Sequence, residues 1–191
     1  MTQRDVVDDL VDQWRAARPD LALDAMATIG RLGRLNGVLR IAIEAELGRH
    51  GLSVGEFDVL AALRRAGAPH AARPVDVARS LMLTPAGLTS RMDRLEEARL
   101  VVRVPDPDDR RSMLVQLTPE GLESIDRAVT DHVANEERLL SGLSAGERAS
   151  LDRLLRRLLA ALGGPEADAP ARRAGRDRET DVRSRAGRRA V

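Results

Sequence analysis

The sequence contains no cysteine, a single tryptophan and a single phenylalanine. The lack of cysteine excludes disulfide bonds, thiolate metal sites and sensing by cysteine oxidation. The three histidines, His50, His70 and His132, are scattered along the chain, so metal binding has little support. Surface or partly packed roles for them are favoured over pH sensing. We therefore expect no cofactor.

Long apolar runs are also missing. No stretch approaches the roughly 18 consecutive apolar residues of a membrane span, and the N-terminal sequence MTQRDVVDDLVDQW is charged where a signal peptide would be apolar. The sequence also has no glycine-rich phosphate loop, metal-ligand spacing or nucleophile-and-base motif. We expect a cytoplasmic protein without a membrane partner that is not an enzyme.

Basic and acidic residues are nearly balanced, and the formal net charge is +1. Bulk charge therefore does not mark the chain as a nucleic-acid binder, and the positions of the basic residues must decide. Every basic side chain apart from histidine is arginine. Arginine makes bidentate contacts to guanine edges and phosphates better than lysine, but a bias in codon usage explains the lack of lysine at least as well.

What the sequence does contain is a series of amphipathic helices. A short helix is expected over 5–16 and a longer one over 21–47, where apolar residues recur at intervals of three and four. Ser53 and Glu56 form a capping box that starts another helix, which reaches about Arg65. The composition, 43% hydrophobic and 32% charged over 191 residues, is that of a globular protein.

The most informative segment is 74–121. A short helix begins at Pro74, and Thr84 and Pro85 start a second helix that ends near Ala98. Its inward side is marked by the apolar residues Leu88, Met92 and Leu95. Its outward side carries small, polar or charged residues: Ala86, Thr89, Ser90, Asp93, Arg94 and Glu97. Strands are expected over 100–104 and 113–117, around a charged loop. This order is typical of a winged helix-turn-helix, in which a helix enters the major groove and a hairpin reaches the next groove.

The C-terminal part again reads as helical. Thr118 and Pro119 start a helix to about 141, and the capping box of Ser144 and Glu147 starts a leucine-rich helix whose excess of apolar residues favours dimerisation. We expect four regions: N-terminal dimerisation helices (1–50), a DNA-binding domain (51–118), C-terminal dimerisation helices (119–162) and a disordered, arginine-rich tail (163–191). For the tail, a solvated segment without a specific role is favoured over nonspecific DNA contact.

Three motifs carry a family resemblance. The segments LMLTPAGLTSRMDRLEEARLV, DPDDRRS and LTPEG occur in the order and spacing of the MarR family, which the chain resembles over about residues 20–162. The resemblance implies a mainly α fold with a small β wing, and a homodimer whose terminal helices interlock. It also implies binding of double-stranded DNA at a palindromic operator, with repression as the default.

The resemblance also assigns DNA contacts. These fall on the second helix and on the wing: Thr84, Pro85, Ala86, Gly87, Thr89, Ser90, Arg91, Arg94, Asp109, Arg110 and Arg111. Asp109 is expected to pair with Arg111 and to hold its guanidinium in the minor groove. The alternatives are an ion pair of Arg94 with Glu97 and a solvated charge at Arg111.

One position departs from the family pattern. Arg99 stands where the family usually has glycine, between the second helix and the wing. If the backbone is left-handed there, a residue other than glycine costs about 1 kcal/mol.

Members of the family usually respond to small anionic or phenolic ligands. Trp14, Asp58, Arg91 and Arg103 are similar to the constellation of the urate-responsive subfamily, which implies urate or a related purine as effector. The alternatives are a packing role for Trp14, a structural ion pair of Asp58 with Arg91, and an Arg103 that faces solvent. For the whole chain, the alternative is a winged-helix module that binds protein instead of specific DNA.

Overall fold

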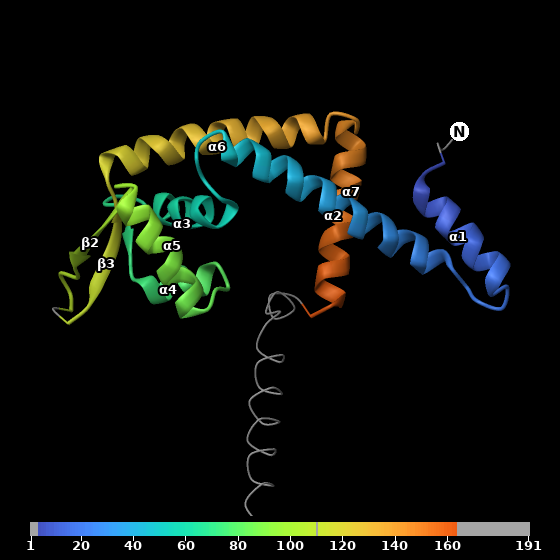
Figure 1. Ribbon diagram of the computed structural model, residues 1–191, viewed down its shortest axis with the longest axis horizontal. Helices are drawn as coiled ribbons and strands as arrows, with labels where there is room; N and C mark the ends of the chain where they lie inside the picture. Colours follow the sequence, from blue (N-terminus) through green and yellow to red (C-terminus); the bar gives the residue numbers. More distant parts are fainter. Residues whose placement is uncertain (1–3, 110, 164–191) are drawn as a thin grey trace, which may run out of the picture.

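The computed structural model describes residues 4–109 and 111–163 (Figure 1). Seven helices lie in these residues: α1 (Val6–Ala17), α2 (Asp24–Gly48), α3 (Val54–Arg65), α4 (Pro74–Ser80), α5 (Pro85–Glu97), α6 (Pro119–Leu139) and α7 (Ala145–Ala161). The expected fold class, mainly α with a small β wing, is confirmed. The expected disorder of the tail falls on residues that lie almost entirely outside the described part.

Three short strands form one antiparallel sheet in the order β1-β3-β2. β2 (Val101–Pro105) and β3 (Met113–Leu117) pair along their whole length, with Val101 opposite Leu117. The third strand, β1 (Ala71–Ala72), pairs with the other edge of β3 and was not expected from the sequence. Two residues are too few to show the alternation that marks a strand.

The core lies where α3, α5, α6 and the sheet meet. The predicted inward residues of α3 (Phe57, Leu60, Ala61 and Leu63) and of α5 (Leu88, Met92 and Leu95) are all buried. Val115 of β3 and Ile125 of α6 close the same cluster. The winged part of the molecule therefore shares one core with α6 and the end of α2, and this core fixes which side of α5 is buried.

Hydroxyl caps set the helix starts, as the sequence predicts. Ser53 and Ser144 each form a complete capping box with a glutamate three residues later. Thr84 and Thr118 accept hydrogen bonds from the backbone N–H groups of the third helical residue, and proline follows each of them. These caps satisfy backbone donors that would otherwise lack partners.

The end of α5 confirms that Arg99 has a left-handed backbone, with φ of 59°. The Arg99 N–H donates to the Glu96 carbonyl and the Leu100 N–H to the Leu95 carbonyl, each at 2.9 Å. This is the Schellman arrangement, in which glycine usually occupies the position of Arg99. The turn between α5 and the wing therefore forms without glycine, the residue that would adopt this backbone conformation without steric strain.

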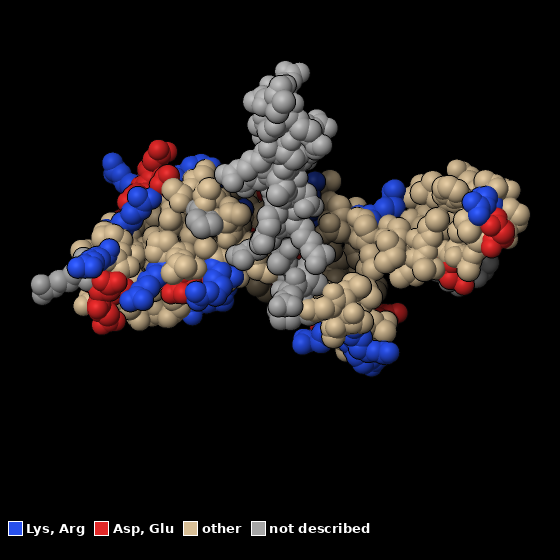
Figure 2. Space-filling model, turned by 90° about the horizontal axis from the view of Figure 1, so that it is seen from below, with Lys and Arg blue, Asp and Glu red and all other residues tan. Residues whose placement is uncertain are grey.

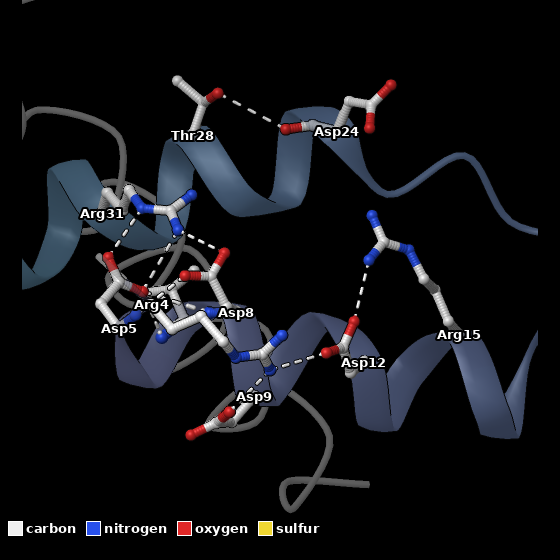
Figure 3. Close-up of polar contacts among 10 residues, drawn as sticks. Arg4, Asp5, Asp8, Asp9, Asp12, Arg15, Asp24, Thr28 and Arg31 are labelled. Carbon is white, nitrogen blue, oxygen red and sulfur yellow. Dashed lines mark hydrogen bonds and ion pairs between the residues drawn. The ribbon is translucent and has the colours of Figure 1, made fainter. Parts of the chain in front are cut away.

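Ion pairs and a small apolar cluster hold α1 on α2 (Figure 3). The Arg31 guanidinium donates to Asp5 at 2.8 Å and to Asp8 at 2.6 Å. Val7 and Val11 pack with Leu23 beneath these contacts. α1 lies at one end of α2, and the winged part lies at the other (Figure 1).

A large apolar surface remains exposed on the helices outside the winged part. None of the residues of α7 is buried. On α2, the side chains of Ile29, Val38 and Ile41 are each more than 60% exposed, at 63%, 62% and 64%. No helix within residues 4–109 and 111–163 is both long and apolar enough to span a bilayer.

Candidate nucleic-acid interface

The exposed side of α5 carries small and polar residues. Ala86, Thr89 and Ser90 are exposed, while Leu88 and Met92 anchor the opposite side in the core. The first turn of α5 has no acidic residue. Its N-terminus therefore keeps the positive end of the helix dipole, which attracts phosphate, without an acidic side chain to offset it.

Arg94 is joined to α3. Its Nε donates to the Glu56 carboxylate at 2.7 Å, and its Nη1 donates to the Ser90 hydroxyl at 3.1 Å. The alternative prediction, an ion pair of Arg94 with Glu97 on the same helix, is therefore wrong. Burial alone would raise the pKa of Glu56, but the hydrogen bonds from Arg94 and Ser53 outweigh it and leave that pKa below its usual value. Any phosphate that Arg94 binds must compete with Glu56.

Arg91 lies against the first turn of α3. A Cβ atom at Gly55 would be 2.5 Å from the Arg91 Cζ, so the guanidinium fits there because residue 55 is glycine. Arg91 and Arg94 line a hollow of about 460 Å³ together with Glu44, Ser53, Val54 and Gly55. Arg91 is thus partly buried against α3, at the edge of this hollow.

Arg103 links the wing to α5. From β2, its guanidinium pairs with Asp93 at 2.6 Å and with Glu96 at 3.5 Å. Arg103 is exposed, as the alternative expected, but it also pairs with two side chains of α5. The single positive charge of Arg103 offsets part of the negative charge of these two residues, which lowers the repulsion between α5 and a phosphate backbone.

The wing tip is shaped through its backbone. The Asp109 carboxylate accepts a hydrogen bond from the backbone N–H of Arg111 at 3.0 Å, not from its guanidinium. The expected side-chain pair of Asp109 with Arg111 is therefore wrong. Among the described residues, the Arg111 guanidinium has no hydrogen bond or ion pair. Arg110, which was also expected to contact DNA, lies outside the described residues.

Asp106 is a structural residue of the wing that the sequence reasoning missed. Only 3% of it is exposed. Its carboxylate accepts hydrogen bonds from the backbone N–H of Asp108 at 2.9 Å and from Arg73, just before α4, at 2.8 Å. The backbone hydrogen bond from Asp108 and the pair with Arg73 hold the pKa of Asp106 below its usual value, against the effect of burial. The available signal was an Asx turn, an aspartate that caps the N–H two residues later.

The four expected effector residues are not together within one chain. Asp58 and Arg91 interact electrostatically, and burial raises the pKa of Asp58 despite the nearby charges of Arg91, Arg65 and His132. Their expected ion pair is absent from the described contacts. The shorter ion pair of Arg103 is with Asp93, which lies two residues from Arg91 on α5 and so points to a different side of the helix, roughly 200° away. Trp14 lies on α1, at the far end of the molecule (Figure 1).

Charge on the outer face of the winged part is mixed. Figure 2 shows arginine side chains gathered over this end of the molecule, with acidic side chains between them. The three-helix unit α3–α4–α5, the exposed polar side of α5 and the hairpin β2–β3 define a winged helix-turn-helix protein.

Comparison with known proteins identifies the family. A sequence profile described as "MarR family" matches residues 50–112. The HTH-type transcriptional regulator PecS of Dickeya dadantii (strain 3937) is 45% identical over 152 residues, which cover 80% of this chain and 92% of PecS. The chain belongs to the MarR family of transcriptional regulators. It is a DNA-binding regulator of transcription and not an enzyme, as the sequence predicts.

Solved structures agree with this assignment. A mutant MarR from E. coli complexed with operator DNA is 27% identical, with a TM-score of 0.62, covering 73% of this chain and 99% of that one. BpsR of Bordetella bronchiseptica, whose DNA binding is regulated by 6-hydroxynicotinic acid, is 29% identical, with a TM-score of 0.59. The match with BpsR covers 68% of this chain and 90% of that one.

Proposed function

We propose that two copies of this chain bind a palindromic operator and repress transcription until a small anionic effector releases them. The observation that carries the proposal is the exposure of Thr89 and Ser90 on α5, together with a wing that carries an Arg111 guanidinium without a hydrogen bond or ion pair to any described residue. A helix of this kind suits the major groove, and an extended arginine suits the narrow minor groove beside it. The related MarR in complex with operator DNA supports this mode of binding.

The dimer is proposed from the exposed apolar surface. Leucines 154, 155, 158, 159 and 162 are all at least 38% exposed in one chain, and the apolar side of α2 adds to them. Monomeric proteins rarely leave so large a continuous apolar surface in water. A twofold pair of chains would bury it and would present two α5 helices to two half-sites of a palindrome.

Substitution of the wing arginine tests the DNA-binding mode. Arg111→Ala should weaken binding to operator DNA by about 1–3 kcal/mol if it reads the groove, and should reduce the salt slope by about one unit. Arg127→Ala is the matched control, because this arginine of α6 pairs only with Glu123 on its own helix. If the Arg111→Ala chain bound as tightly as the native chain across a range of salt concentrations, the wing would have no part in DNA binding.

For the effector, we propose an anion that binds near Arg91 and Asp58, with urate or a related purine as the first candidate. The side of α5 that faces α3 is a suitable place for this effector, because a ligand that moves Arg91 also moves α5. BpsR, whose DNA binding is regulated by 6-hydroxynicotinic acid, supports an aromatic acid as the class of ligand. Arg103 and Trp14 lie elsewhere in one chain, so their part in the site requires a rearrangement or the partner chain.

A titration with urate distinguishes these arrangements. Trp14 is the only tryptophan, so its fluorescence reports on α1 alone. We expect urate to weaken operator binding in the native chain and to have less effect in Arg91→Gln and Asp58→Asn. A change in Trp14 fluorescence on the same titration would place α1 at the site. If neither operator affinity nor fluorescence changed, urate would be excluded as the effector.

A further inference from the structure

Folding brings one histidine and two carboxylates together at the end of α2. Glu46 and His50 are four residues apart, so they lie on the same side of the helix end, and both face Asp131 of α6. One ligand atom from each of the three residues lies within 4.8 Å of the other two. Asp131 is distant from the other two in sequence, so the positions of the histidines along the chain gave little support for a metal site.

We propose that Glu46, His50 and Asp131 bind one Zn²⁺ ion. The imidazole nitrogen and two carboxylate oxygens are ligands that zinc accepts, and a water molecule can complete a four-coordinate site. The ion would tie the end of α2 to α6. Neither the DNA-reading surface nor the proposed effector residues include these three side chains, so the proposal goes beyond the proposed function.

The state of His50 is a second observation that points to a ligand. Its Nε2 is buried and has no hydrogen bond among the described residues. Asp131 Oδ2 lies only 3.1 Å from this nitrogen, but it is not aligned with the ring N–H. Two ligands of one tetrahedral zinc, each at about 2.0–2.1 Å from the ion, lie roughly 3.3 Å apart. The 3.1 Å between His50 and Asp131 therefore fits two ligands of one ion as well as it fits an ion pair.

The competing contacts of Glu46 are weak. Its side chain is 7% exposed, and it accepts from Arg49 at 3.2 and 3.3 Å and from Arg138 at 3.1 Å. Charge-assisted hydrogen bonds are usually about 2.7–2.9 Å long. The side chains of Arg49 and Arg138 are 72% and 61% exposed, so either can turn into water when a divalent cation takes the carboxylate.

Calorimetric titration of the metal-free full chain with Zn²⁺, without DNA, tests the proposal. We expect one ion per chain, and a loss of affinity of at least about tenfold in His50→Gln and in Asp131→Asn, as is usual when a metal site loses a partner. Arg138→Gln should bind Zn²⁺ more tightly, because a competing cation is gone. Mg²⁺ should not bind, because it prefers an all-oxygen octahedral site.

The matched control is His132→Gln. His132 also lies beside a carboxylate, Glu136 at 3.2 Å, but on one helix and without a third ligand. Its removal should leave zinc affinity unchanged. Circular dichroism establishes that each variant folds, and the exposed Asp131 gives a variant with little risk to the core. Equal zinc affinity of the native chain, His50→Gln and Asp131→Asn would overturn the proposal. Since no DNA is present, this result is independent of operator binding.

Discussion

At the scale of single residues, Arg99 is the clearest case of local strain. Its φ of 59° is a conformation that glycine adopts without a steric penalty. We expect Arg99→Gly to raise the free energy of unfolding by about 1 kcal/mol. Urea denaturation of the two chains measures this difference in the free energy of unfolding. Arg99→Ala is the control, because alanine removes the side chain but keeps the strain. Equal stability of the two variants would show that the backbone there is not strained.

The ionised carboxylate of Asp58 lowers the stability of the folded chain, because it is partly buried. Burial raises its pKa in the folded chain, so its ionised form opposes folding, and this cost is absent at a pH where the carboxyl is protonated in both states. We expect Asp58→Asn to have a higher Tm than the native chain at pH 7. The difference should vanish as the pH falls below about 3.9, the ordinary value for aspartate.

Thermal unfolding followed over this pH range measures the effect. Asp152→Asn is the control, since this exposed carboxylate of α7 pairs only with Arg156. A lower Tm of Asp58→Asn at pH 7 would mean that the attraction of Arg91 outweighs burial. A partly buried carboxylate that lowers folding stability and lies near an arginine is typical of a residue that binds a ligand.

Residue roles were predicted less well than residue positions. The sequence identifies Arg94, Arg103 and Asp109 as notable charges, but it does not show which of many neighbours each one meets. Arg94 pairs with Glu56 across two helices, a contact that depends on packing and not on spacing along one helix. Local rules such as caps and glycine positions need only a few adjacent residues, so they can be read directly.

At the scale of elements, the wing depends on its attachment to α4. Buried Asp106 joins the wing loop to Arg73, just before the first helix of the helix-turn-helix. We expect Asp106→Ala to lower operator affinity by about tenfold and to reduce the salt slope, because the loop that carries Arg111 loses its fixed position. Fluorescence anisotropy with labelled operator DNA at several salt concentrations measures both.

Asp108→Ala is the matched control for the wing. Asp108 lies in the same turn, but it contributes its backbone N–H to Asp106 and its side chain is exposed. This variant should bind operator DNA like the native chain. If both substitutions weakened binding equally, the charge of the loop would matter more than the anchor.

Helices and hairpin strands were predictable, because each has several residues of periodic apolar pattern and a start signal. The starts of α3, α5, α6 and α7 follow from their hydroxyl caps. β1 was not predictable, since two alanines next to the helix-turn-helix become a strand only when β3 offers an edge. Its existence depends on tertiary structure.

At the scale of the whole molecule, the apolar surface of α7 predicts a dimer. Leu158→Glu should break it, because burying an apolar side chain stabilises an interface by about 1.5–3 kcal/mol and a twofold axis repeats each contact. Sedimentation velocity should show the native chain at twice the mass of one 20.8 kDa chain and the variant at that single mass. Arg156→Gln, on the side of α7 away from Leu158 and paired with Asp152, should stay dimeric. A native chain that sedimented as a monomer would refute the dimer.

The central claim is that a twofold pair of chains reads a symmetric operator with α5 and the wing. A footprint on the DNA that flanks the gene of this protein tests it most directly. We expect a protected palindrome whose half-sites are about 10–10.5 base pairs apart, or a multiple of this, with the outer edges lost in Arg111→Ala. Protection without twofold symmetry, or no protection at concentrations at which the chain is dimeric, would contradict the account.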